Sequence, residues 1–238
     1  MTQEKIKEEI ISVIQKNRIS SVEVADALGK QGVINGPKPL TPGKFIVGEV
    51  QYIFGYSESN WPIHEQGHHV KEGGILFVDT VGCNDKAAFG DLVAKYFILY
   101  KNMEGLVVNG LLRDVHTLKK ESYPIWCTGV TPLGCFNRPV ELTAEIKAHT
   151  DKQRELIEGS IMVCDDSGCT IIEKRLLNED TKKKLEFVEL QEDIWYYCID
   201  TLKWSTYETV CLKNYLKYPD VLPKTLRDQL SNIDLEKK

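Results

Sequence analysis

Apolar residues recur along the first thirty positions with the spacing of amphipathic helices. A first helix is predicted over residues 4–16, and its apolar positions are Ile6, Ile10, Val13 and Ile14. A second helix is predicted directly after it, because Ser20 or Ser21 can cap a segment whose apolar positions are Val22, Val24, Ala25 and Leu28. The glycines and prolines between Gly32 and Gly43 then predict a loop.

Short apolar runs predict strands in the middle of the chain. These runs are Phe45–Phe54, Ile75–Val78, Leu106–Val108 and Pro124–Cys127. A helix predicted over residues 91–101 separates the second run from the third. A strand–helix–strand unit of this kind implies parallel pairing with a right-handed crossover, and a short helix is predicted over residues 115–121.

The last third of the chain combines a hairpin with helices. Two apolar runs, Ser160–Cys164 and Cys169–Ile172, flank the turn signal Asp165-Asp166-Ser167-Gly168. Residues 179–216 are predicted to be helical, and the tail after Pro219 is expected to pack poorly. The pattern as a whole predicts one α/β domain over residues 1–238, with a core at about 18–175 and a helical C-terminal extension over 176–238.

Composition and charge argue against nucleic acid and membrane as partners. Hydrophobic residues make up 42% of the chain, charged residues 27%, and the formal net charge is −5. A nucleic-acid-binding surface is usually basic, whereas here the one dense run, Lys182–Lys184, is flanked by acidic residues. No apolar run approaches the ~20 residues that span a bilayer, and the N-terminus lacks a signal peptide. A cytoplasmic protein is predicted.

Seven cysteines are present, an odd number, and no two have the C-x-x-C spacing. Most of them lie among apolar residues, as Cys164 and Cys198 do. This usage is typical of reduced cysteines in a cytosolic protein, so neither a disulfide framework nor a zinc–thiolate site is expected.

Candidate chemistry begins at Gly90-Asp91-Leu92-Val93, where a turn meets the start of a helix. Backbone N–H groups and the positive end of the helix dipole can bind a carboxylate or phosphate at such a place. The alternative is that Gly90 only turns the chain and Asp91 caps the helix.

Arg113 and Asp114 follow the strand at Leu106–Val108, and ligands of parallel sheets collect beyond the carboxyl ends of strands. Arg113 can hold a carboxylate or polarise a carbonyl oxygen, and Asp114 can ligate a hard divalent cation. The alternatives are a surface salt bridge or an N-cap by Asp114.

The order of these blocks resembles one known family. The blocks are Gly73-Gly74-Ile-Leu-Phe-Val-Asp79, Gly90-Asp91-Leu92-Val93, the run from Gly105 to Arg113-Asp114, and Gly129-Val130-Thr131-Pro132, flanked by Ala25–Leu28 and Val163–Gly168. From about residue 18 to about residue 175 the chain is similar to the regulator of ribonuclease E activity A family, which includes the 4-hydroxy-4-methyl-2-oxoglutarate aldolases.

The resemblance implies a swivelling-domain αββ sandwich that forms trimers, with hexamers left open. It also implies a 2-oxo acid substrate and a divalent metal, Mg²⁺ or Mn²⁺. By matching positions, Gly90, Asp91, Leu92 and Val93 would bind the substrate carboxylate, Arg113 the keto oxygen and developing enolate, and Asp114 the metal. Asp91 would orient a metal-bound water.

Two departures from the family pattern bear on activity more than on fold. One extra residue separates Asp91 from Arg113, and Thr117 stands where many members carry an acidic residue. The region from Glu141 to Gly159 also resembles the family poorly.

The leading hypothesis is a metal-dependent lyase that forms a pyruvate enolate, either by retro-aldol cleavage or by oxaloacetate decarboxylation. Both reactions need positive charge beside the enolate as it forms. The alternative from the same resemblance is a non-enzymatic regulator that binds a ribonuclease or another partner.

A remote alternative is a zinc hydrolase, because His64-Glu65-Gln66-Gly67-His68 matches the HExxH pattern. A zinc site of this type needs a helix that places both histidines on one face. Gly67 weakens that helix, and no downstream zinc-ligand motif is evident. The sequence therefore favours a polar surface helix at this position.

Overall fold

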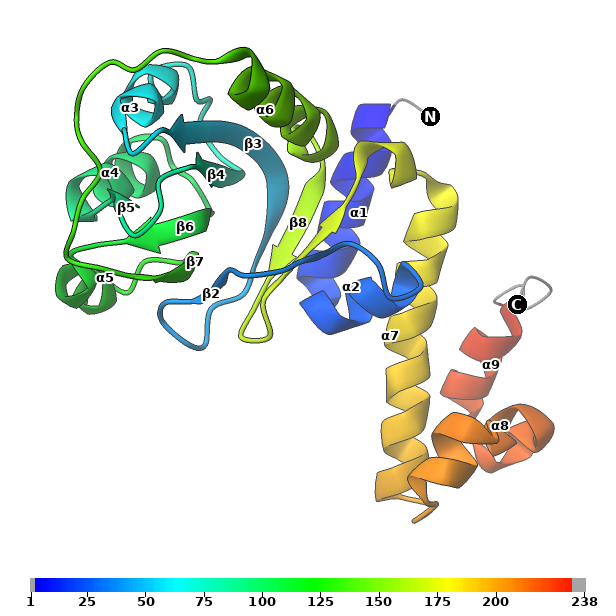
Figure 1. Ribbon diagram of the computed structural model, residues 1–238. Coiled ribbons are helices and arrows are strands. Elements are labelled where there is room, and N and C mark those ends of the chain that lie inside the picture. The colour runs from blue at the N-terminus through cyan, green and yellow to red at the C-terminus, as the bar shows by residue number, and fades with distance from the viewer. Residues whose placement is uncertain (1–2, 233–238) are drawn as a thin grey trace.

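A mixed β-sheet forms the centre of the protein in the computed structural model, which describes residues 3–232 (Figure 1). The strand order is β1-β9-β8-β3-β4-β6-β7-β2, and β5 pairs with β6 at one end. The strands are β1 (Val33–Ile34), β2 (Lys38–Pro39), β3 (Ile46–Tyr56), β4 (Ile75–Val81), β5 (Ala87–Phe89), β6 (Gly105–Leu112), β7 (Ile125–Val130), β8 (Ile161–Cys164) and β9 (Cys169–Ile172).

Helices connect the strands and occupy both ends of the chain. The α-helices are α1 (Gln3–Asn17), α2 (Ser21–Ala27), α3 (Trp61–Gly67), α4 (Asp91–Lys95), α5 (Val115–Glu121), α6 (Ala144–Ile157), α7 (Glu179–Asp200), α8 (Asn214–Lys217) and α9 (Lys224–Asn232). Short 3₁₀ or π turns are η1 (Tyr96–Tyr100), η2 (Lys174–Leu176), η3 (Tyr207–Cys211) and η4 (Pro219–Val221). The predicted helix over 91–101 is therefore α4 continued by the π turn η1.

The parallel pairing that the sequence predicted is confirmed. Strands β3, β4, β6 and β7 pair in parallel, while β8 and β9 form the predicted antiparallel hairpin. Strand β6 is longer than predicted and continues to Leu112, so Arg113 follows the strand directly. The carboxyl ends of β4, β6 and β7 consequently lie at one edge of the sheet.

The two faces of this sheet are covered by different elements. On one face, side chains such as Leu76, Val78 and Val108 pack with residues of α3, α4, η1 and α5. On the other face, Phe77, Val107 and Trp126 pack with Ile157 of α6 and with the β8–β9 hairpin. Because successive residues of a strand point to opposite faces, this alternation decides which side each polar strand residue joins.

The N-terminal helices form as their sequence predicts. Ser20 caps α2 in a capping box, since its side chain accepts from the Glu23 backbone N–H and the Glu23 side chain accepts from the Ser20 N–H. Helix α1 buries Ile6, Ile10 and Ile14 against β3, β8 and α7. Burial of each such side chain stabilises the fold by about 1.5–3 kcal/mol.

The C-terminal part forms a separate apolar cluster beside the far half of α7, which extends away from the sheet (Figure 1). The expectation that the tail after Pro219 packs poorly is wrong for the described residues, because Leu222 and Leu230 are buried in this cluster. Helix α7 also ends at Asp200, earlier than predicted. The division into a core and a C-terminal extension stays a prediction. No helix within residues 3–232 is long and apolar enough to cross a membrane.

Candidate active site

The end of strand β6 places Arg113 and Asp114 at the sheet edge. The Arg113 backbone N–H donates to the Phe89 carbonyl at 3.1 Å, which continues the pairing of β6 with β5. Asp114 has φ 56° and ψ 34°, a left-handed conformation that is uncommon for residues other than glycine. This conformation stops the strand and lets α5 begin at the next residue.

Asp114 occupies the N-cap position of α5, but its side chain does not cap that helix. Its Oδ2 instead accepts from the Asp91 backbone N–H at 3.3 Å, at the start of α4. The N-cap interpretation considered for Asp114 is therefore wrong for its own helix. The carboxylate faces a different helix N-terminus, where the dipole favours negative charge.

Gly90 and Asp91 form the other side of the site. A Cβ atom at Gly90 would overlap Asp114 Oδ2 and would lie 3.0 Å from Arg113 Cγ, so only glycine fits here without displacing those side chains. Asp91 turns its own Oδ1 to the Leu92 N–H at 2.9 Å. Two acidic residues thus lie at the start of α4, and one of them, Asp114, is next to Arg113.

The Arg113 guanidinium lies beside the Asp114 carboxylate. Its Nε is 3.6 Å from Asp114 Oδ2, and the side chains of Arg113 and Asp114 are 49% and 41% exposed. Both groups therefore remain accessible to a small molecule. Leu92 is exposed and Val93 packs partly against the core, so within this turn the backbone and Asp91 supply the polar groups.

Gly134 is a site residue that the sequence did not reveal. A Cβ atom there would lie 2.6 Å from Arg113 Nη1, so the loop after β7 contacts the guanidinium. The loop is held in place because the Thr131 N–H donates to the Leu112 carbonyl at 2.9 Å. Nothing near Gly134 in the sequence signals this contact, which follows from β7 being the neighbour of β6.

The donor set suits a cation that keeps much of its water. Among the described residues, no group of three or more His, Cys, Asp or Glu side chains could form a protein-only metal cage. Mg²⁺ needs no such cage, since it is commonly held by one or two carboxylates and several waters. Gly90 lets the Asp114 carboxylate lie against the start of α4, and the exposed side of this carboxylate, with Asp91 adjacent in sequence to Gly90, fits this requirement.

The HExxH residues lie elsewhere, on α3 and its C-cap. His64, Glu65 and His68 are all exposed, as expected for a polar surface helix. Although His64 is exposed, nearby protein atoms remove part of the water around its imidazole. This loss of water, followed by the positive charge of the nearby His68, lowers the pKa of His64. Within residues 3–232, no third His, Cys, Asp or Glu joins this pair in a group that could hold a metal ion.

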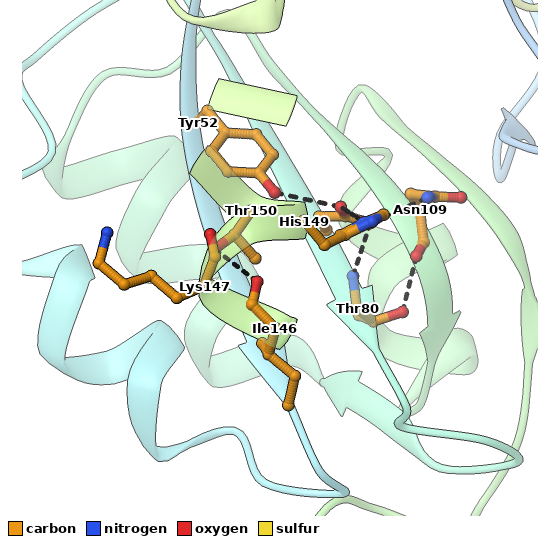
Figure 2. Close-up of polar contacts among 8 residues, drawn as sticks. Tyr52, Thr80, Asn109, Ile146, Lys147, His149 and Thr150 are labelled. Atoms are coloured by element: carbon orange, nitrogen blue, oxygen red, sulfur yellow. Dashed lines mark hydrogen bonds and ion pairs between the residues drawn. The ribbon is translucent and has the colours of Figure 1, made fainter. Parts of the chain in front are cut away.

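A second polar cluster lies on the face of the sheet that α6 covers, and Figure 2 shows Tyr52, Thr80, Asn109 and His149 of this cluster. The Asp79 carboxylate is almost fully buried and accepts from the Tyr52 hydroxyl at 3.1 Å and from Asn109 Nδ2 at 2.9 Å. The Thr80 N–H donates to the same carboxylate at 2.9 Å, and His149 Nε2 of α6 lies 3.6 Å away. Burial and the neighbouring Asp79 raise the pKa of Tyr52 well above its ordinary value, so the phenol stays protonated.

Comparison with known proteins identifies the family. A family model described as RraA-like, Aldolase/RraA, matches residues 21–171. The chain belongs to the RraA-like family. The matched range contains Gly90, Asp91, Arg113, Asp114 and Gly134, and it ends within β9, before the C-terminal helices.

Individual relatives of this RraA-like chain are distant. DlpA of Legionella pneumophila is 27% identical over 184 residues, which are 74% of this chain but 29% of DlpA. A protein of Halalkalibacterium halodurans, provisionally named a 4-hydroxy-4-methyl-2-oxoglutarate aldolase, is 25% identical over 75% of this chain and 86% of its own length.

Among solved structures, Streptomyces coelicolor RraAS2, described as an unusual member of the RNase ES inhibitor RraA protein family, has a TM-score of 0.60. It is 23% identical and covers 78% of this chain and 96% of its own. The family resemblance and the α/β fold with helices at both ends are thereby confirmed. The roles assigned to individual residues stay predictions.

Proposed function

We propose that this chain is a divalent-metal-dependent lyase that cleaves a carbon–carbon bond of a 2-oxo acid through a pyruvate enolate. The observation that carries the proposal is the direction of the Asp114 carboxylate. It does not cap α5 but faces the start of α4, beside Asp91 and Arg113. A position used only to start α5 would not need this arrangement.

Asp114, with Asp91 adjacent, would hold Mg²⁺ or Mn²⁺ at this edge. When bound, such a cation supplies Lewis-acid stabilisation of negative charge. The Asp114 carboxylate is exposed and Asp91 is half-buried beside it, which leaves room for water and substrate around the cation.

The remaining side chains and backbone groups bind and orient the substrate in this proposal. The N-terminus of α4 at Gly90–Val93 would bind the substrate carboxylate, because backbone N–H groups and the helix dipole favour an anion there. The Arg113 guanidinium would bind the keto oxygen, on which negative charge grows as the enolate forms. Asp91 has one carboxylate oxygen turned to its own helix and would use the other to orient water.

Retro-aldol cleavage of 4-hydroxy-4-methyl-2-oxoglutarate and decarboxylation of oxaloacetate both leave the same enolate. The site residues serve either reaction, so the proposal covers an aldolase and a decarboxylase. Exposed apolar side chains surround the site, at Leu92, Val130 and Leu133. A homotrimer or hexamer would cover some of them, which supports the oligomer that the family resemblance implies.

The direct test is pyruvate release from each substrate with and without Mg²⁺, in the wild type and in Asp114→Asn. Asparagine keeps an oxygen that can accept from the Asp91 N–H but loses the charge that a cation needs. The exposed Asp85→Asn is the matched control. Equal turnover by wild type and Asp114→Asn would discard the assignment of the metal ligand.

The second proposal is a non-enzymatic regulator that binds a ribonuclease or another protein. It is supported by Thr117, which stands where many members carry an acidic residue, and by the exposed Leu92 beside the site. Pull-down from cell extract beside a metal titration separates the two proposals. Tight binding of a partner, together with indifference to Mg²⁺ and 2-oxo acids, would favour the regulator.

A further inference from the structure

Two cysteines from distant parts of the chain lie in segments that run side by side, next to the loop after β7 that contacts Arg113. Cys83 follows strand β4 and is buried, whereas Cys135 lies in the loop after β7 and is partly exposed. Both are free thiols, and the β-bridge between Ala87 and Gly134 brings the two segments that carry them together. The remaining cysteines include Cys211, which is exposed on the C-terminal part.

Backbone hydrogen bonds hold the two segments in register. The Ala87 N–H donates to the Leu133 carbonyl at 2.8 Å, and the Cys135 N–H donates to the Ala87 carbonyl at 3.0 Å. On the other segment, the Lys86 N–H donates to the Cys83 carbonyl at 3.0 Å. The approach of the two thiols is therefore set by the scaffold around β5.

The two thiols differ in their surroundings. The pKa of Cys135 is lowered, mainly by the interaction with Cys83. Burial opposes this shift, and the positive charge of Lys86 adds to it. The interaction with Cys135, followed by burial, raises the pKa of Cys83. Lys86 is itself held by Glu58, at 2.8 Å between Nζ and Oε1. Cys135 is the more accessible of the two thiols and has the positive charge of Lys86 nearby, which favours it as the attacking thiol.

We propose that Cys83 and Cys135 form an oxidisable thiol pair that a low-molecular-weight disulfide converts to an intramolecular disulfide. The Cys135 thiolate attacks one sulfur of the reagent and forms a mixed disulfide, releasing the first thiol. The Cys83 sulfur then attacks the Cys135 sulfur and displaces the second thiol, and the two protein protons leave with the two released thiols. The protein is oxidised by two electrons and the reagent disulfide is reduced.

The bond would act on the candidate active site through the loop that carries Cys135. The preceding residue, Gly134, lies against the Arg113 guanidinium. A disulfide would fasten residues 131–136 to the segment after β4. This inference does not rest on lyase activity, because the thiol pair and its oxidation are measured independently.

The experiment treats the native full chain with a graded glutathione disulfide to glutathione series, then alkylates under acid quench and maps peptides by mass spectrometry. The expected product is a Cys83–Cys135 cross-linked peptide and a protein lighter by about 2 Da. In the reduced protein, iodoacetamide should label Cys135 about tenfold faster than Cys83. Hydrogen exchange of the amides in residues 131–136 should slow on oxidation.

Variants give the matched controls. Cys83→Ser should leave Cys135 as a mixed disulfide with glutathione and abolish the cross-link, whereas Cys211→Ser should leave the cross-link unchanged. The proposal is overturned if the folded wild type forms no intramolecular bond across the series, or if the mapped bond joins other cysteines. Because the mapping is done on the wild type, misfolding of a variant does not decide the result.

Discussion

Asp79 and Asp114 are both aspartates near the carboxyl ends of neighbouring parallel strands, yet their surroundings differ. Asp79 is buried, and its carboxylate accepts from Tyr52, Asn109 and Thr80 on one face of the sheet. The Asp114 side chain is 41% exposed and accepts one long hydrogen bond, from the Asp91 N–H. The oxygens of the Asp79 carboxylate are already occupied by hydrogen bonds within the protein, whereas the Asp114 carboxylate can still bind a ligand. We therefore expect Asp79 to stabilise the fold and Asp114 to take part in cation binding and catalysis.

The largest expected effect is a loss of catalytic activity at the Arg113–Asp114 site. Arg113→Ala should lower kcat/KM for pyruvate release by about 100-fold or more, equivalent to about 2.7 kcal/mol of transition-state stabilisation. Its exposure should keep the loss of folding stability small. Steady-state assays beside thermal unfolding check both, with Arg175→Ala as a control at another exposed arginine. If the stability of Arg113→Ala fell in parallel with its activity, the loss of activity could not be assigned to catalysis, and the contrast between the Asp79 and Asp114 regions would fail.

Gly90→Ala tests how closely the site is packed. The added methyl group would overlap Asp114 Oδ2 and force the carboxylate away from the start of α4. We expect at least about a tenfold loss of kcat/KM, since small displacements of positioned groups cost this much or more. Gly129→Ala is the control, because its methyl group would meet only the flexible end of Leu111. Full activity in Gly90→Ala would show that the position of Asp114 is unimportant.

On the side of stability, Asp79→Asn should lower the free energy of unfolding by about 2 kcal/mol. The amide group of asparagine would place a donor against at least one of the donors that now bind the carboxylate, leaving buried groups unpaired. Pyruvate release by the folded variant should change little. Urea unfolding followed by circular dichroism measures the effect, and an unchanged midpoint would contradict the structural role of Asp79.

The smallest effect is expected for Tyr52→Phe, which removes one hydrogen bond to Asp79 and should cost about 1 kcal/mol near neutral pH. The folded-state pKa of Tyr52 is raised above the ordinary 10.0, mainly by burial. The neutral phenol is thus favoured in the fold, and its contribution is fully present below pH 10. Above that pH the unfolded chain loses the proton first, so the stability difference between wild type and variant should shrink. A difference that grows with pH would contradict this account.

The sequence predicted those parts of the molecule that depend on local pattern. The second N-terminal helix, the hairpin at Asp165–Gly168 and the strands around β4 and β6 all formed where apolar spacing and turn residues placed them, and of the two candidate caps Ser20 is the one used. Gly90, Asp91, Arg113 and Asp114 could also be brought together, because the resemblance to a family supplied their relation. Packing of the segment after Pro219 could not be predicted, since it depends on α7 turning an apolar side toward it.

Contacts between neighbouring strands were the least visible in the sequence. Gly134 meets Arg113, and Asn109 meets Asp79, only because β7, β6 and β4 are adjacent in the sheet. Cys83 and Cys135 come together for a different reason, because the segments after β4 and β7 meet around Ala87 of β5. The left-handed conformation of Asp114 was likewise unforeseen, because an aspartate before a helix ordinarily caps that helix.

The central claim, that Asp114 provides a cation site which Asp79 does not, is tested most directly by Mn²⁺ binding measured by electron paramagnetic resonance. Titrations would compare the wild type, Asp114→Asn and Asp79→Asn, each first shown to be folded. We predict that the wild type and Asp79→Asn bind Mn²⁺ alike and that Asp114→Asn binds it at least about tenfold more weakly. Equal binding by the wild type and Asp114→Asn would contradict the account.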